Sequence, residues 1–259
     1  STLHVIDMPD PVPGPSQVLL SVKAAGVNFA DVMMRRGAYE GGPVPPFVPG
    51  MEAAGTVERA GANAGPWKIG DAAIVQVPLG AYAEKIVVPA DKLFPLPPGM
   101  GFEQGAAVPV NFATAYHLLK TVGRLEKGQT VLIHAAAGGV GTAAVQLARR
   151  WGATVLATAG SPEKLDLARS LGADLAVNYR EEDFEPAVMR HTGGAGVDLV
   201  LESVGGEVFH KSLNVLKPLG RLAVFGIASG RVESVETRRL LFSSKAVMGF
   251  HMSSVSGDP

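Results

Sequence analysis

Hydrophobic and polar positions follow different patterns in the two parts of the chain. Up to about residue 108, short apolar, β-branched segments are separated by turns rich in proline and glycine. This pattern is typical of a small β-rich domain. It predicts one helix near residues 28–37 and strands at residues 17–27, 53–61, 72–77 and 83–88.

From about residue 109, apolar strands alternate with helical segments. This alternation predicts βαβ units and a parallel, doubly wound sheet whose strands are apolar on both faces. The sequence therefore predicts an α/β fold with two domains, residues 1–108 and 109–259. Strands are expected at residues 129–135, 153–159, 173–179, 197–204, 220–227 and 245–250, and the clearest helices at 140–151 and 161–172.

A glycine-rich loop joins the first of these strands to its helix, in the stretch HAAAGGVG at residues 134–141. Glycines at this place let a dinucleotide's pyrophosphate approach the helix N-terminus, whose free N–H groups and dipole favour an anion. Ala136 takes the first position of the usual G-x-G-x-x-G pattern. An ordinary strand–helix turn is the alternative, but strand, loop, helix and second strand fall at the spacing of a dinucleotide-binding unit. The residues expected to contact the cofactor here are Ala137, Gly138, Gly139, Val140 and Gly141.

The end of the next strand indicates which nicotinamide cofactor is bound. NAD enzymes usually place an acid there to hold the ribose hydroxyls, whereas this strand ends ATAGS at residues 157–161. A 2′-phosphate beside Gly160 would accept hydrogen bonds from Ser161 and from the cation of Lys164, and Tyr179 can lie beside the same pocket. A solvated helix lysine is the alternative for Lys164. The missing acid favours NADPH over NADH.

Composition and charge exclude several functions. The net charge of −1 over 259 residues offers no basic face for nucleic acid or a membrane surface, and no apolar run is long enough to span a membrane. The absence of cysteine excludes disulfides, thiolate zinc sites, iron–sulfur clusters and a cysteine nucleophile, and agrees with a reducing compartment such as the cytoplasm. The chain begins with Ser1, so a few residues are expected to precede it.

Three long stretches resemble one family: AAGVNFADVMMRRGAY at 24–39, PPFVPGMEAAGTV at 45–57 and the segment from the glycine-rich loop to residue 165. The chain is similar to the medium-chain dehydrogenase/reductase superfamily, and within it to the zinc-free, zeta-crystallin-like quinone oxidoreductases. The resemblance implies a GroES-like catalytic domain, a Rossmann domain and NADPH between them. It also implies that a C-terminal segment returning to the catalytic domain is missing here. Because Gly50-Met51-Glu52 stands where zinc-dependent relatives have a glycine-histidine-glutamate motif, no metal is expected.

The resemblance also implies roles for single residues. Asn28 would lie at the nicotinamide and orient the ring or a substrate carbonyl, with helix capping as the alternative. Tyr39 corresponds to the candidate proton donor of related enoyl thioester reductases, with simple packing as the alternative. Thr114 would begin the helix that links the domains and contact the cofactor. The alternative is that Thr114 only marks the N-terminus of this helix. Asn28 and Tyr39 are the candidate catalytic residues, and the ribose and nicotinamide would be lined by Ser203, Val204, Phe225, Gly226 and Ile227.

These features favour NADPH-dependent reduction of quinones or related conjugated carbonyl compounds by hydride transfer, in which the cofactor carries the chemistry and the protein supplies position. Two alternatives stay open: enoyl thioester reduction, and NADPH binding without catalysis as in crystallin-like or vesicle-associated relatives. His134 is expected to be structural. The apolar segment 245–250 is expected at the sheet's edge, where pairing with a second copy would form a homodimer. The alternative is that the missing C-terminal segment covers this edge.

Overall fold

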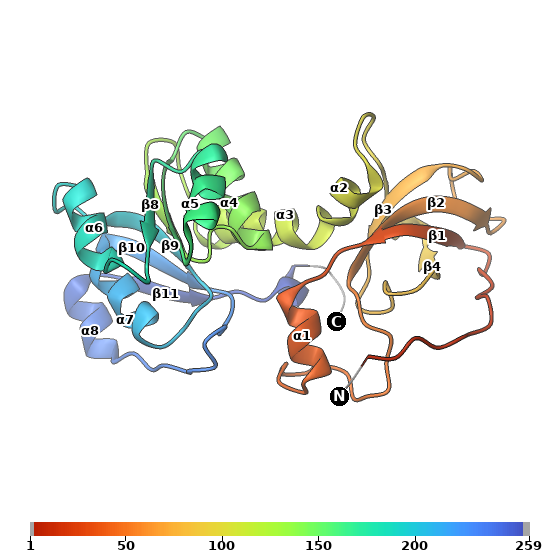
Figure 1. Ribbon diagram of the computed structural model, residues 1–259, viewed down its shortest axis with the longest axis horizontal. Coiled ribbons are helices and arrows are strands. Elements are labelled where there is room, and N and C mark those ends of the chain that lie inside the picture. The colour runs from red at the N-terminus through yellow and green to blue at the C-terminus, as the bar shows by residue number, and fades with distance from the viewer. Residues whose placement is uncertain (1–2, 256–259) are drawn as a thin grey trace. The chain divides into compact units, whose positions relative to one another are not determined.

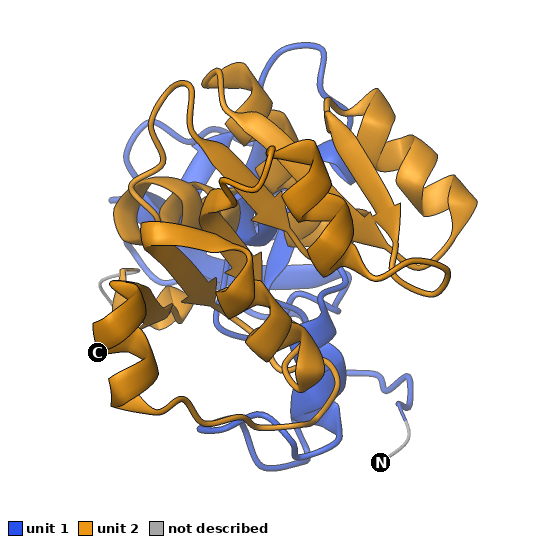
Figure 2. Cartoon of the chain, turned by 90° about the vertical axis from the view of Figure 1, so that its left-hand side faces the viewer, with its two compact units in different colours: residues 1–111 blue, residues 112–259 orange. Residues whose placement is uncertain are grey.

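The structure is a computed structural model that describes residues 3–255. The chain divides into two compact units, residues 1–111 and residues 112–259 (Figure 2). Each unit has its own sheet and its own buried core. No helix of the described part is long and apolar enough to cross a membrane.

Unit 1 is built on a five-stranded antiparallel sheet in the order β4-β1-β2-β3-β5 (Figure 1). The four strands that the sequence predicts are present, together with a short fifth strand that it does not predict. The strands are β1 (Gln17–Ala25), β2 (Glu52–Ala60), β3 (Ala72–Gln76), β4 (Lys85–Pro89) and β5 (Leu93–Pro95). Strand β5 escaped prediction because it has three residues and runs into the prolines that follow it, so it has no periodicity to detect.

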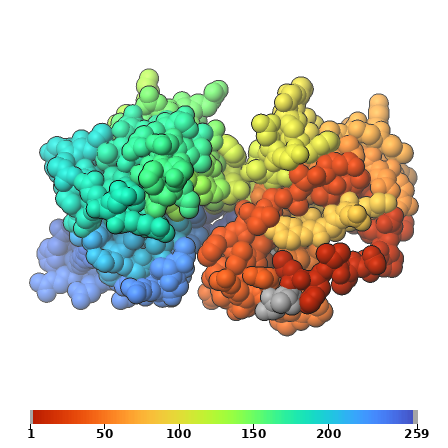
Figure 3. Space-filling model, viewed as in Figure 1, coloured from red at the N-terminus to blue at the C-terminus, as the bar shows by residue number. Residues whose placement is uncertain are grey.

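Helix α1 (Phe29–Arg35) confirms the helix expected in unit 1. A 3-10 turn, Ala90–Lys92, and helix α2 (Phe102–Ala106) were not predicted. Residues 3–12 form no regular secondary structure and lie on the outside of the unit (Figure 3), where Val5 is fully exposed. The core of the unit comes from inward-facing positions of the strands and includes Val18, Leu20, Ala53, Val57, Val75 and Val88.

Unit 2 contains a six-stranded parallel sheet in the order β11-β10-β9-β6-β7-β8. This is the doubly wound sheet that the alternation of strands and helices predicts (Figure 1). Its strands are β6 (Thr130–Ile133), β7 (Thr154–Ala159), β8 (Leu175–Asn178), β9 (Val197–Glu202), β10 (Leu216–Val224) and β11 (Ala246–Gly249). Its helices are α3 (Pro109–Tyr116), which starts in unit 1 and continues as a π-helix, His117–Val122, then α4 (Gly139–Arg150), α5 (Pro162–Ser170), α6 (Phe184–His191), α7 (Glu207–Asn214) and α8 (Thr237–Ser243).

Successive residues of the central strands face opposite sides of this sheet, and both sides are covered. In β6, Val131 and Ile133 belong to the cluster that includes the alanines of α4, whereas Leu132 belongs to the cluster under α6 and α7. A strand buried on both faces has a continuous run of apolar residues, and for this reason the sequence predicted this sheet. The parallel order brings the carboxyl ends of the strands to one edge of the sheet, where ligands bind in folds of this type.

Candidate functional site

A pocket of about 420 Å³ lies at the carboxyl ends of β6 to β9 in unit 2. It adjoins the glycine-rich loop and the N-terminus of α4, and we call it the glycine-loop pocket. Of the residues predicted to bind the cofactor, Ala137, Gly138, Gly160, Lys164, Tyr179 and Val204 line it. The sequence did not predict the lining residues His134, Ala135, Thr158, Ala159, Phe184, Val208, Ala228 and Ser229.

The glycine-rich loop turns sharply between β6 and α4. Ala135 has a φ of +49°, a left-handed conformation that residues other than glycine rarely adopt, and Gly138 is the residue that precedes the helix. A Cβ on Gly141 would stand 2.3 Å from the Ala135 carbonyl oxygen, so this glycine is required for the helix to pack close to the loop. Ala136, at the first position of the pattern, is completely buried. Gly139, Val140 and Gly141 form the first turn of α4 and do not line the pocket.

The far wall of the glycine-loop pocket is formed by the segments that follow β7 and β8. A Cβ on Gly160 would stand 2.5 Å from the Tyr179 hydroxyl and 3.3 Å from Nε of Arg180, so the absence of a side chain brings both groups close to this backbone. Lys164 is the cation among the described lining residues, and no carboxylate occurs among them. The Ser161 hydroxyl does not line the pocket; it hydrogen-bonds to the Glu163 carboxylate and lowers the pKa of that group.

His134 follows β6 and is almost completely buried at the wall of the glycine-loop pocket. Its Nδ1 is 2.9 Å from the Thr158 hydroxyl and its Nε2 is 2.9 Å from the Ser212 hydroxyl. Burial lowers its pKa to about 3, so the ring is neutral at physiological pH. The imidazole connects β6, β7 and α7, which agrees with the structural role expected for it.

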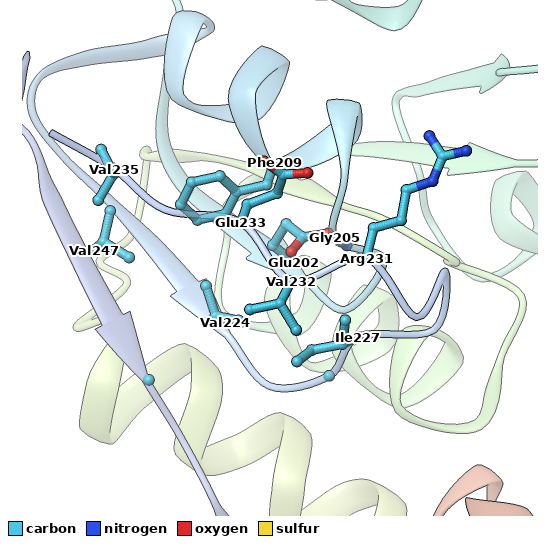
Figure 4. Close-up of a pocket in the computed structure, with 12 residues that line it drawn as sticks. Glu202, Gly205, Phe209, Val224, Ile227, Arg231, Val232, Glu233, Val235 and Val247 are labelled. Carbon is cyan, nitrogen blue, oxygen red and sulfur yellow. The ribbon is translucent and has the colours of Figure 1, made fainter. Parts of the chain in front are cut away.

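The predicted cofactor contacts that follow β9 and β10 do not all lie in the same pocket. Gly226 and Ile227 line a second pocket of about 270 Å³, which we call the β11 pocket (Figure 4). Phe225 packs against the core on the α4 side of the sheet, and the Ser203 backbone carbonyl accepts a hydrogen bond from the Ala228 N–H. Thr114 does not begin its helix, because α3 starts five positions earlier at Pro109.

Glu202 ends β9 inside the wall of the β11 pocket, and it is completely buried (Figure 4). Its Oε1 accepts from the N–H groups of Val204, at 2.6 Å, and Gly205, at 2.9 Å. Within residues 3–255, its Oε2 has no hydrogen-bond partner. Burial raises the pKa of this carboxyl, and the two backbone N–H groups oppose the shift.

Unit 1 holds a buried polar network around Asn28, the residue before α1. The Asn28 backbone N–H donates to Asp31 Oδ2 at 2.9 Å, so Asp31 supplies the cap of this helix turn. The Asn28 side chain makes no capping hydrogen bond; its Nδ2 donates to Glu52 Oε1 at 2.7 Å. The amide nitrogen is therefore directed at the sheet of unit 1 and not at the end of the helix.

Asp31 anchors the other side of this network. It accepts from the Tyr82 hydroxyl at 3.0 Å and from the Gly50 N–H at 3.2 Å. Burial and the neighbouring Asp31 raise the pKa of Tyr82, so its hydroxyl stays a hydrogen-bond donor. These contacts give Asp31 a structural role in unit 1.

Tyr39 lies in the turn after α1 and is half-buried. Burial raises the pKa of its hydroxyl, so the phenol keeps its proton at neutral pH. No group of three or more His, Cys, Asp or Glu side chains within residues 3–255 is placed to hold a metal ion.

Comparison with known proteins agrees with this architecture. Residues 14–98 match the family described as alcohol dehydrogenase GroES-like domain, and residues 139–258 match the family described as zinc-binding dehydrogenase. A 2-haloacrylate reductase from Burkholderia sp is 39% identical over 94% of this chain and 77% of its own. The quinone oxidoreductase of Pseudomonas aeruginosa is 41% identical over 86% of this chain and 69% of its own. The chain belongs to the medium-chain dehydrogenase/reductase superfamily. Within this superfamily it belongs to the quinone oxidoreductases.

Solved structures of this family are close to the chain over both units. The quinone oxidoreductase from Thermus thermophilus, whose NADPH complex is also known, is 42% identical with a TM-score of 0.86, covering 100% of this chain and 79% of that one. The Escherichia coli quinone oxidoreductase complexed with NADPH is 35% identical with a TM-score of 0.88, covering 96% and 77%. The chain spans 52–67% of the length of the synaptic vesicle membrane protein VAT-1 homologues that it also matches, which are 37% identical to it.

Proposed function

We propose that this protein is an NADPH-dependent oxidoreductase that reduces quinones or related conjugated carbonyl compounds by hydride transfer. The observation that carries the proposal is the glycine-loop pocket, which has Lys164 in its wall and no carboxylate among its described lining residues. Family relatives named quinone oxidoreductase and 2-haloacrylate reductase support the reaction class, and three of the solved relatives have structures complexed with NADPH.

The fit of this pocket to NADPH rests on the chemistry of its walls. Gly138 borders it at the N-terminus of α4, where free N–H groups favour a pyrophosphate. On the far wall, Lys164 and the Tyr179 hydroxyl would hold a 2′-phosphate, and Arg180 is a second cation beside Gly160. Arg180 makes no side-chain hydrogen bond or ion pair within the described residues, so its guanidinium is available to an anion. Ser161 would contribute only after its hydroxyl leaves Glu163.

When bound, NADPH supplies the hydride, and the protein supplies position and a proton. In unit 1 we assign Asn28 to orientation of the reacting groups and Tyr39 to proton donation at its phenolic oxygen. The Tyr39 phenol carries a proton at neutral pH, as a proton donor requires, and burial raises its pKa further. Ser203, Val204, Phe225, Gly226 and Ile227 stay proposed contacts of the ribose and nicotinamide, and Thr114 a proposed cofactor contact.

The test is a comparison of NADPH oxidation with three acceptors: a benzoquinone, a 2-haloacrylate and an enoyl-CoA. Rapid oxidation with either of the first two supports the proposal. Preference for the enoyl-CoA would indicate enoyl thioester reduction instead. Tight NADPH binding with no turnover of any acceptor would indicate a binding protein.

We also propose a homodimer that pairs through β11. In the described part of the sheet, β11 is an edge strand hydrogen-bonded on one side to β10. Leu241 and Phe242 of the preceding helix α8 are largely exposed. Pairing of two β11 edges around a two-fold axis would satisfy the open backbone groups and bury apolar surface. The cytoplasm stays the expected compartment, because the chain has no cysteine that an oxidising compartment would exploit.

A further inference from the structure

We propose that Glu52 is a positioning residue that fixes the side-chain amide of Asn28 with its oxygen turned away from Glu52, as a hydrogen-bond acceptor for a ligand. The ligand group is an N–H or O–H donor, either on the nicotinamide nucleoside or on the substrate. The inference deepens the proposed function and rests on it.

The hydrogen bonds of Glu52 leave one arrangement of the Asn28 amide. Glu52 is the first residue of β2 and is completely buried. Its Oε2 accepts from the backbone N–H of Val110 at 2.8 Å, and a backbone N–H can only donate. Its Oε1 lies 2.7 Å from Nδ2 of Asn28. Since both oxygens of an ionised carboxylate are acceptors, the amide nitrogen of Asn28 must face Glu52.

The Oδ1 of Asn28 is left over by this arrangement. Within residues 3–255 no group donates to it, and it is not one of the buried atoms that lack a partner. The backbone of Asn28 is held by Asp31, so the residue cannot swing away as a whole. The unit therefore presents an oriented amide oxygen with unused acceptor capacity, at a residue otherwise almost fully buried.

The surrounding chain is shaped to hold the Glu52 carboxylate in this place. A Cβ on Gly26 would stand 2.2 Å from Glu52 Oε1, so the carboxylate occupies the space of the missing side chain. Burial raises the pKa of Glu52, and nearby Asp31 adds to this effect, whereas the two donors, Val110 and Asn28, oppose it by bonding to the carboxylate form. A carboxylate that served packing alone would not require both a glycine beside it, Gly26, and hydrogen-bond donors to both of its oxygens.

The oxygen and the nitrogen of the Asn28 amide bind different ligand groups. A substrate carbonyl carries no hydrogen and cannot bond to Oδ1; it could only accept the second Nδ2 hydrogen, which Glu52 does not use. The carboxamide N–H of the nicotinamide, a ribose hydroxyl or a hydroxyl of the substrate can donate to Oδ1. The acceptor that Glu52 orients on Asn28 therefore serves a donor group of the ligand.

The experiment reverses the polarity of this hydrogen bond. In Glu52→Gln, the side-chain oxygen must stay on the Val110 N–H, so the amide nitrogen faces Asn28. Asn28 then turns to offer Oδ1 inward, and its nitrogen replaces the acceptor on the ligand side. We expect a loss of about tenfold or more in NADPH affinity if the donor is on the cofactor, or in KM for the quinone at saturating NADPH if it is on the substrate.

The double variant Asn28→Asp/Glu52→Gln should recover much of this loss. An aspartate at position 28 accepts from the glutamine nitrogen with one oxygen and presents the other to the ligand. Asn28→Asp alone should be worse than the double variant, because two carboxylates then face each other. Glu58→Gln is the matched control, since Glu58 lies on the same strand but pairs with Lys85. Thermal unfolding establishes that each variant is folded.

The outcomes separate this inference from the proposed function. Binding of 2′,5′-ADP, which lacks the nicotinamide half, should be the same in all variants. If the unmodified protein binds neither NADPH nor 2′,5′-ADP, the proposed function fails. If it binds both, but Glu52→Gln leaves NADPH affinity and quinone KM unchanged, or the double variant is no better than Asn28→Asp, the role of Glu52 is wrong. Should Glu52→Gln not fold, the comparison of Asn28→Asp with the double variant decides.

Discussion

Replacement of Lys164 by alanine is the most direct test of the NADPH assignment. Lys164 contributes its side chain to the glycine-loop pocket from the first turn of α5, and it makes no ion pair within residues 3–255. No ion pair is therefore lost in Lys164→Ala, and because the side chain is exposed the fold should keep its stability. Only ligands that place an anionic group at this wall of the pocket should bind more weakly.

The size of the effect follows from the exposure of the lysine. A hydrogen bond between charged groups contributes about 1.5–3 kcal/mol, and solvent screening at an exposed side chain favours the lower end. A loss of about 1.4 kcal/mol is a tenfold change in affinity. We therefore expect NADPH to bind about tenfold more weakly while NADH binding hardly changes. The difference should shrink in high salt, where such pairs are screened.

The assay is a titration of both cofactors by fluorescence or calorimetry. Arg169→Ala is the matched control, because Arg169 is a cation on the same helix that pairs with Asp166 and does not line the pocket. Arg180→Ala should give a second, separate loss for NADPH. Equal losses of NADPH and NADH in Lys164→Ala, or no loss of NADPH, would refute placement of the 2′-phosphate at this wall.

Four further predictions test other parts of the molecule. Burial lowers the pKa of His134 to about 3, whereas an unfolded histidine titrates near 6.5, so the unfolded chain binds the proton first as pH falls. The free energy of unfolding, measured by denaturant titration, should therefore decrease as pH drops below about 6.5. This pH dependence should disappear in His134→Gln. The raised pKa of Glu202 has the opposite effect on stability: the folded chain binds this proton more tightly, so stability is lost as pH rises through that pKa. Glu202→Gln should therefore raise the melting temperature more at pH 8 than at pH 4. An equal effect at both pH values would contradict this. Activity should survive prolonged EDTA, and loss that zinc alone restores would overturn the expectation of a zinc-free site. Val247→Pro removes a backbone donor from β11, so sedimentation should show a wild-type dimer and a monomeric variant, whereas a wild-type monomer would refute the pairing.

The sequence predicted the sheet of unit 2 because its strands are buried on both faces and are therefore apolar throughout. Lys164 and Tyr179, which the sequence predicted as cofactor contacts, both line the glycine-loop pocket, since each follows a parallel strand and the carboxyl ends of such strands share one edge. Gly226 and Ile227 follow β10 in the same way, yet they line the β11 pocket. The end of a strand tells where a loop starts but not which side of the loop faces a given cavity.

The two buried glutamates were beyond sequence reasoning for a different physical reason. The partners of Glu52 and Glu202 include backbone N–H groups, which every residue except proline carries, so no side-chain pattern marks them. Only the structure shows why Gly26 has no side chain: it adopts no left-handed conformation, so the glycine leaves space for the Glu52 carboxylate and does not serve backbone freedom.

The hydrogen bonds of these two carboxyls show why they should behave differently. Both oxygens of Glu52 have donors, one of them on a side chain that can turn, so a change at Glu52 is passed on to Asn28. Glu202 has donors on one oxygen only, and both are backbone groups that cannot turn. Removal of its charge should therefore change stability and leave ligand orientation alone, whereas the same substitution at Glu52 should change orientation. Glutamate-to-glutamine exchange should therefore change ligand affinity at Glu52, which positions a ligand group, and change stability at Glu202, whose buried charge destabilises the fold.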